Sequence, residues 1–136
     1  MGKVTDLGVL FTIVAIVEFA YAGTALLIPP SLMLFVTGWV LSPDGQWIVK
    51  LIGAALLFQG LIAWIFRKAP HIGVAWALAL YQIMAATIDW MMWIALADDG
   101  IFSTGMAQFT TASSVVLHYA LGILLIIAIR RHGASA

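Results

Sequence analysis

Five polar side chains lie inside long apolar runs of this sequence: Glu18, Gln59, Gln82, Asp89 and His118. Carboxyl and imidazole groups in such runs are the usual parts of proton or ion paths, and they can also hold a ligand or a neighbouring helix. If each run is a helix, its rise places Asp89 roughly 12 Å, Glu18 and His118 about 15 Å and Gln59 about 18 Å from the same end. Four runs therefore each contribute a polar group at similar depth.

The residues around these groups repeat with helical spacing. Small and polar residues share one face of the first, third and fourth runs, and such faces turn inward because lipid cannot form hydrogen bonds with them. The three stripes are Ala15, Glu18, Tyr21 and Ala22; Gln82, Ala85, Ala86, Asp89 and Trp93; and Thr111, Ser114, His118 and Gly122. We interpret them as the interior of a four-helix bundle.

The composition places these helices in a membrane. Of the 136 residues, 64% are hydrophobic and only 9% are charged, whereas soluble domains have about a quarter charged. A bilayer core needs about 20 apolar residues per helix, and four runs have that length, at about 7–28, 47–66, 73–97 and 108–129. The sequence predicts an all-α integral membrane four-helix bundle, with residues 1–136 in a single transmembrane domain.

The connections between the spans differ in character. Pro29 and Pro30 end the first span, and the following SLMLFVTGWV segment is too short to cross a membrane and too apolar for a solvated loop. We expect a short interfacial helix between spans 1 and 2. The tight RKAPH turn predicts that the second and third spans pack side by side. The first apolar run continues past Ala20-Tyr21-Ala22, so we expect a retained span and not a cleaved signal peptide.

Basic residues indicate the orientation. Lys3, Arg67, Lys68, Arg130 and Arg131 all flank ends that share one side of a four-span chain, and Lys50 is the exception. The positive-inside rule then places both termini in the cytoplasm. We expect a multi-pass membrane protein with this orientation.

Several kinds of chemistry are not expected. Zero formal net charge gives no field that attracts nucleic acid, and the absence of cysteine excludes thiol chemistry. Ser113 and Ser114 precede His118 on one helix without a nucleophile elbow, so enzyme activity is not expected. No helix carries two metal ligands at ExxH or HxxxH spacing, and no metal site is predicted. His118 alone could ligate a haem or chlorophyll-type pigment, and the sequence names no cofactor.

Residues 21–68 resemble small bacterial four-span membrane proteins of the DoxX-like kind. The resemblance rests on YAGTALLIPP, an apolar segment after it, and SPDGQWIVKLIGAALLFQGLIAW before Arg67 and Lys68. It implies a four-helix bundle of the bacterial inner membrane, and some such relatives act beside oxidoreductase complexes. It carries no functional residue over to this chain.

Three hypotheses of function follow. The first is a non-catalytic accessory or assembly subunit of a larger membrane complex, whose partners are membrane lipids and other membrane subunits or further copies of itself. The second is a small homo-oligomeric transporter or channel, with Glu18, Asp89 and His118 on a proton or ion path. The third is a bundle that binds a lipid, a quinone or a pigment.

Overall fold

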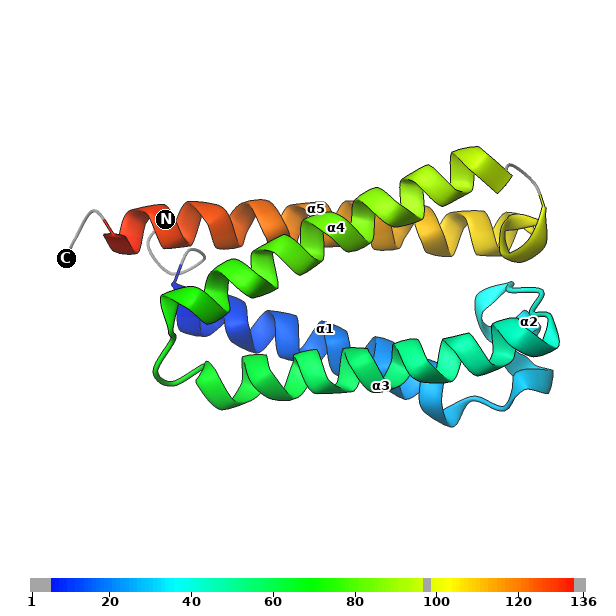
Figure 1. The fold of residues 1–136 in the computed structure, drawn as a ribbon, viewed down its shortest axis with the longest axis horizontal. Coiled ribbons are helices and arrows are strands. Elements are labelled where there is room, and N and C mark those ends of the chain that lie inside the picture. The colour runs from blue at the N-terminus through cyan, green and yellow to red at the C-terminus, as the bar shows by residue number, and fades with distance from the viewer. Residues whose placement is uncertain (1–5, 97–98, 134–136) are drawn as a thin grey trace.

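The computed structural model describes residues 6–96 and 99–133, and four of its helices are long and apolar enough to cross a membrane. The chain is therefore an all-helical, multi-pass membrane protein, as the sequence predicts. Its elements are α1 (Leu7–Leu27), α2 (Pro30–Thr37), α3 (Pro43–Phe66), α4 (Ile72–Leu96), the 3-10 helix η1 (Gly100–Phe102) and α5 (Gly105–Gly133) (Figure 1). The short helix predicted between spans 1 and 2 is α2.

Local signals in the sequence fix where the helices begin. The Asp6 carboxylate accepts hydrogen bonds from the backbone N–H groups of Gly8 (2.8 Å) and Val9 (3.1 Å), and so caps α1. Ser42 caps α3 in the same way through the N–H of Gly45 (3.1 Å), directly before the proline that starts that helix. These caps satisfy N–H groups that have no partner within the helix.

Lys50 explains how α1 ends next to two prolines. Its ammonium group, on α3, donates hydrogen bonds to the carbonyl oxygens of Ala25 (2.8 Å), Leu26 (3.0 Å) and Ile28 (2.9 Å). The last carbonyls of a helix lack intrahelical partners and carry partial negative charge, so a cation is stabilising there. The one basic residue that departs from the charge asymmetry of the sequence is therefore the cap of α1.

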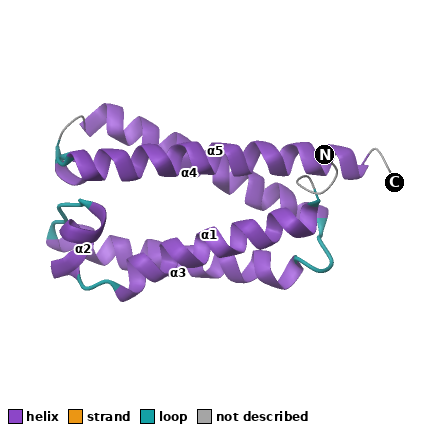
Figure 2. Cartoon of the chain, turned by 180° about the vertical axis from the view of Figure 1, so that it is seen from behind, coloured by secondary structure: helices purple, strands orange, loops and turns teal. Residues whose placement is uncertain are grey.

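The four long helices form two closely packed pairs, α1 with α3 and α4 with α5. Glycine permits each close approach: a Cβ added at Gly53 of α3 would lie 2.8 Å from Cβ of Ala25, and one at Gly122 of α5 would lie 2.7 Å from Cδ1 of Ile83. Figure 2 shows the two pairs on opposite sides of the molecule. The tight turn after Phe66 does not make α3 and α4 a packed pair, because both helices present their small residues to other partners.

The pairs are closed at one end and separate toward the other. The start of α1, the α3–α4 turn and the end of α5 lie together at what we call the basic end (Figure 1). The main core lies on this side and includes Leu10, Phe11, Val14 and Leu125, all with 0% exposure. At the opposite end, which we call the α2 end, α2 and η1 connect the spans.

A contact between α2 and α5 joins the two pairs at the α2 end. The Thr104 hydroxyl donates a 2.7 Å hydrogen bond to the carbonyl of Gly38, the residue that follows α2. Gly38 has a φ of 79°, and a Cβ there would lie 2.5 Å from the backbone nitrogen of Ala107. Only glycine allows both this backbone conformation and this approach.

Candidate functional site

A chain of hydrogen bonds crosses the interior between three helices. Nε2 of Gln82 on α4 donates to Oε1 of Glu18 on α1 at 2.6 Å. On its other side, Oε1 of Gln82 bonds to Nδ1 of His118 on α5. Glu18 and Gln82 have 0% exposure and His118 has 5%. The amide of Gln82 therefore links the two helix pairs at the point where the apolar core ends.

The direction of this chain fixes the hydrogen on His118. A carboxylate oxygen of Glu18 only accepts, so the Gln82 amide must turn its NH2 group toward Glu18 and its oxygen toward His118. An amide oxygen also only accepts, so Nδ1 of His118 must carry the donated hydrogen. The second carboxyl oxygen, Oε2 of Glu18, is buried and makes no hydrogen bond within the described residues.

Two tyrosines border the imidazole. Tyr21 of α1 stacks on His118, with ring centroids 5.7 Å apart and an angle of 25° between the planes. Tyr81 of α4 meets the same ring edge-on at 6.4 Å. The imidazole is thus held by an amide and two aromatic rings, and its orientation is fixed from three sides.

Asp89 lies on the inward face of α4, seven residues beyond Gln82. Its carboxylate lies near the side chain of Ser114 on α5. Although spacing places it on the face of the fully buried Gln82, Asp89 is only half-buried. The bundle therefore opens between these two positions.

Two heptad-spaced stripes show how it opens. Along α4, Ala75 and Gln82 have 0% exposure, Asp89 is half-buried and Leu96 is 38% exposed. Along α3, the residues at the same spacing are Phe66, which packs against the core cluster, the half-buried Gln59, and Ile52, which is 50% exposed. Along both stripes the side chains become more exposed toward the α2 end, because α3 and α4 diverge there.

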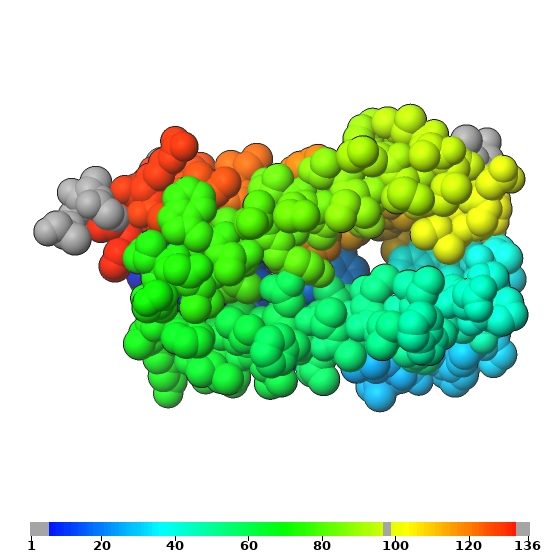
Figure 3. Space-filling view, viewed as in Figure 1, coloured from blue at the N-terminus to red at the C-terminus, as the bar shows by residue number. Residues whose placement is uncertain are grey.

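The space-filling view shows an opening between α3 and α4 on the side of the α2 end (Figure 3). We call it the lateral opening and assign to it the residues of the two stripes that are partly or fully exposed toward this end, Ile52, Gln59, Asp89 and Leu96. The apolar core closes it toward the basic end, and the contact of Thr104 with Gly38 joins the pairs beyond it. It faces sideways between two of the spans.

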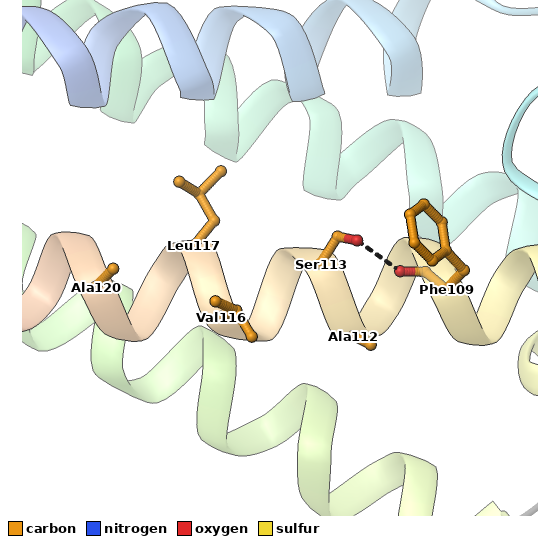
Figure 4. A pocket seen from close by; sticks show the side chains of 6 residues that line it. All are labelled: Phe109, Ala112, Ser113, Val116, Leu117 and Ala120. Carbon is orange, nitrogen blue, oxygen red and sulfur yellow. Dashed lines mark hydrogen bonds between the residues drawn. The ribbon is translucent and has the colours of Figure 1, made fainter.

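An apolar hollow of about 530 Å³ lies elsewhere, along α5 (Figure 4). Its lining residues are Phe109, Ala112, Ser113, Val116, Leu117 and Ala120. At 100° per residue, Phe109 and Val116 project from the side of α5 opposite His118. The Ser113 hydroxyl turns back to the carbonyl of Phe109 at 2.8 Å. This hollow offers lipid only apolar surface, and the polar chain does not belong to it.

The structure thus divides the five candidate residues between two places. Glu18, Gln82 and His118 form the hydrogen-bonded chain, whereas Gln59 and Asp89 border the lateral opening. The third span contributes Gln82 to the chain, although Asp89 better matches the depth of Glu18 in the sequence. Within residues 6–96 and 99–133, no three acidic or histidine side chains are grouped as metal ligands are.

Sequence reasoning did not assign a role to Lys50 or Tyr81. The signal for Lys50 was its charge in a span that follows Pro29 and Pro30, since a helix ended by prolines leaves carbonyl groups that need a donor. Tyr81 had only its position beside Gln82 as a signal, and its contact with His118 depends on how α4 and α5 pack.

The chain matches no family model, and no curated protein and no solved structure is similar to it. The resemblance of residues 21–68 to DoxX-like proteins stays a prediction.

Proposed function

We propose that this chain is a non-catalytic integral membrane protein that takes a lipid-soluble ligand from the bilayer into the lateral opening. The observation that carries the proposal is the loss of cover along α4, from Gln82 at 0% exposure to the half-buried Asp89. Polar groups at this depth are expensive when they face lipid. An opening of this kind, with a few convergent polar groups between apolar walls, is typical of a small-molecule site.

The geometry favours binding over a path across the membrane. Among the described residues, the buried polar side chains extend from Thr37 and Thr111 near the α2 end to Glu18, Gln82 and His118. Toward the basic end the interior is filled by Leu10, Phe11, Val14 and Leu125 without exposed surface. An ion path needs polar groups or water along its whole length, and this apolar layer interrupts it.

The surroundings of Ser113 and Ser114 support the proposal that the protein is not an enzyme. The hydroxyl of Ser113 bonds to a backbone carbonyl and Ser114 lies near Asp89, and the hydrogen bond of His118 goes to Gln82 and to neither serine. Nδ1 of His118 bonds to an amide oxygen. A nucleophile needs a base within hydrogen-bond reach, and this pairing does not provide one.

We also propose a bacterial inner membrane as the location, with the basic end in the cytoplasm. The start of α1, the α3–α4 turn and the end of α5 share one end of the structure, and the basic residues Arg67, Lys68, Arg130 and Arg131 flank that end. The positive-inside rule favours this direction.

The test is native mass spectrometry of the protein after mild extraction from its own membrane. We expect a bound molecule of lipid-like mass on the wild type. Ala85→Phe adds a ring one turn before Asp89 and should remove this molecule. Ala54→Phe makes the same change on an exposed part of α3 and should retain it.

Either of two results would contradict the proposal. A wild-type protein that carries no bound molecule would contradict a binding role of the lateral opening. A molecule retained equally by both variants would lie outside it. Other polypeptides present in fixed ratio would instead favour the accessory-subunit hypothesis.

A further inference from the structure

The acidic groups of the interior lack a basic partner. Glu18 and Asp89 lie within the spans, and Lys50 is the only Lys or Arg in the four spans apart from Arg130 and Arg131, which lie in the last turn of α5 at the basic end. The Lys50 ammonium binds three carbonyl oxygens at the end of α1. His118 directs Nδ1 to Gln82 and contacts neither carboxyl group through it. Within residues 6–96 and 99–133, no Lys or Arg side chain therefore pairs with either acid.

Both carboxyl groups retain unused acceptor positions. Oε2 of Glu18 has no hydrogen-bond partner in the described chain although its side chain is fully buried. The carboxylate of Asp89 lies near Ser114, and an ionised carboxylate offers about four acceptor positions. A buried polar atom without a partner is destabilising, so a donor that reaches these groups is favoured.

Aromatic rings surround the same region. Tyr21 and Tyr81 border the imidazole of His118, and Trp93 lies one turn beyond Asp89, where it stacks on Phe102 at 6.2 Å. Faces of aromatic rings attract cations, most of all where water is excluded. Acidic acceptors among aromatic rings complement an ammonium group with an apolar tail.

From this complementarity we infer that the ligand is an amphiphilic amine whose ammonium head lies against Asp89 and whose hydrocarbon tail lies between α3 and α4. The inference rests on the proposed function, because it names the ligand class for the same opening. The ammonium N–H groups fill the acceptor positions of the Asp89 carboxylate and neutralise its charge. Ile52 and Leu96, both exposed at the opening, provide apolar contact for the tail.

The experiment compares two probes that share a tail, dodecylammonium and dodecanol. Each is titrated against the full chain and followed by native mass spectrometry. We expect dodecylammonium to bind at least about tenfold more tightly than dodecanol. Asp89→Asn keeps the shape of the side chain and should weaken dodecylammonium binding about 10- to 100-fold, the usual range for a lost hydrogen bond to a charged group.

Two control variants separate the inference from the proposed function. Asp44→Asn removes the same charge from an exposed carboxylate in the first turn of α3 and should leave binding unchanged. Ala85→Phe should exclude both probes. If dodecanol binds as tightly as dodecylammonium, or if Asp89→Asn has no effect while Ala85→Phe still excludes the probe, the amine class is wrong and the opening remains a ligand site. If Ala85→Phe excludes neither probe, the proposed function fails as well.

Discussion

Gln82 and Glu18, 64 residues apart in the chain, are joined by a 2.6 Å hydrogen bond between a side-chain amide and a carboxylate. The same amide bonds to His118 through its oxygen. One side chain thus satisfies a carboxylate on α1 and an imidazole on α5, and it does so at the boundary between the closed core and the lateral opening. Replacing it affects two helices at once.

Gln82→Leu should lower the free energy of unfolding by about 1–2 kcal/mol. It leaves a carboxylate oxygen and an imidazole N–H without partners, and interhelical bonds in membranes contribute up to about 1.7 kcal/mol each. The matched control is Gln59→Leu, at a half-buried position beside the opening, which should change stability by less than about 0.5 kcal/mol. Unfolding in bicelles measures the stability of both variants. Equal losses of stability would show that the hydrogen bonds of Gln82 to Glu18 and His118 contribute no more than an ordinary polar side chain.

Lys50→Met should loosen the end of α1. Three carbonyl oxygens lose their donor, and we expect a loss of about 1–3 kcal/mol. Hydrogen exchange should accelerate at the backbone amides of residues 24–28. Lys68→Met removes the same charge from an exposed side chain and should change neither quantity. Unchanged protection in Lys50→Met would refute the capping role.

Two Gly→Ala substitutions should differ in sign. At Gly53 the new Cβ would lie 2.8 Å from Cβ of Ala25 and 2.9 Å from Cγ of Leu26, so α1 and α3 must move apart. Overpacking of this kind costs about 1–3 kcal/mol. At Gly23 of α1 nothing lies within 4 Å of the added atom, and the gain in helix propensity should stabilise by up to about 1 kcal/mol. A similar response at both sites would contradict the close α1–α3 packing.

Single cysteines test the orientation, because the natural chain contains none. Ala69→Cys lies in the exposed turn between α3 and α4, and Ser103→Cys lies at the exposed end of η1. In cells whose outer membrane is permeabilised and whose inner membrane is intact, a membrane-impermeant maleimide should label position 103 and not position 69. Lysis should make both reactive. The reverse pattern would place the basic end outside.

Much of the architecture could be predicted from local sequence. The length of each apolar run sets a span, and Pro29 with Pro30 ends the first, so the four long helices and α2 follow without knowledge of packing. The candidate residues also follow locally, since a polar group such as Glu18 inside an apolar run needs a reason to be there.

Which polar groups meet could not be predicted, because depth along a helix does not say which neighbour a face meets. Asp89 has the depth of Glu18, yet Gln82 makes the bond, since α3 and α4 diverge before Asp89 is covered. The pairing of α3 with α1, and not with the span that follows it, depends on glycine contacts such as that of Gly53 with Ala25. The sequence by itself determined the spans and their polar residues through hydropathy and helical period. Only the tertiary structure decided the helix pairs, the Glu18–Gln82–His118 chain and the lateral opening, because these arise from close contacts between residues far apart in the chain.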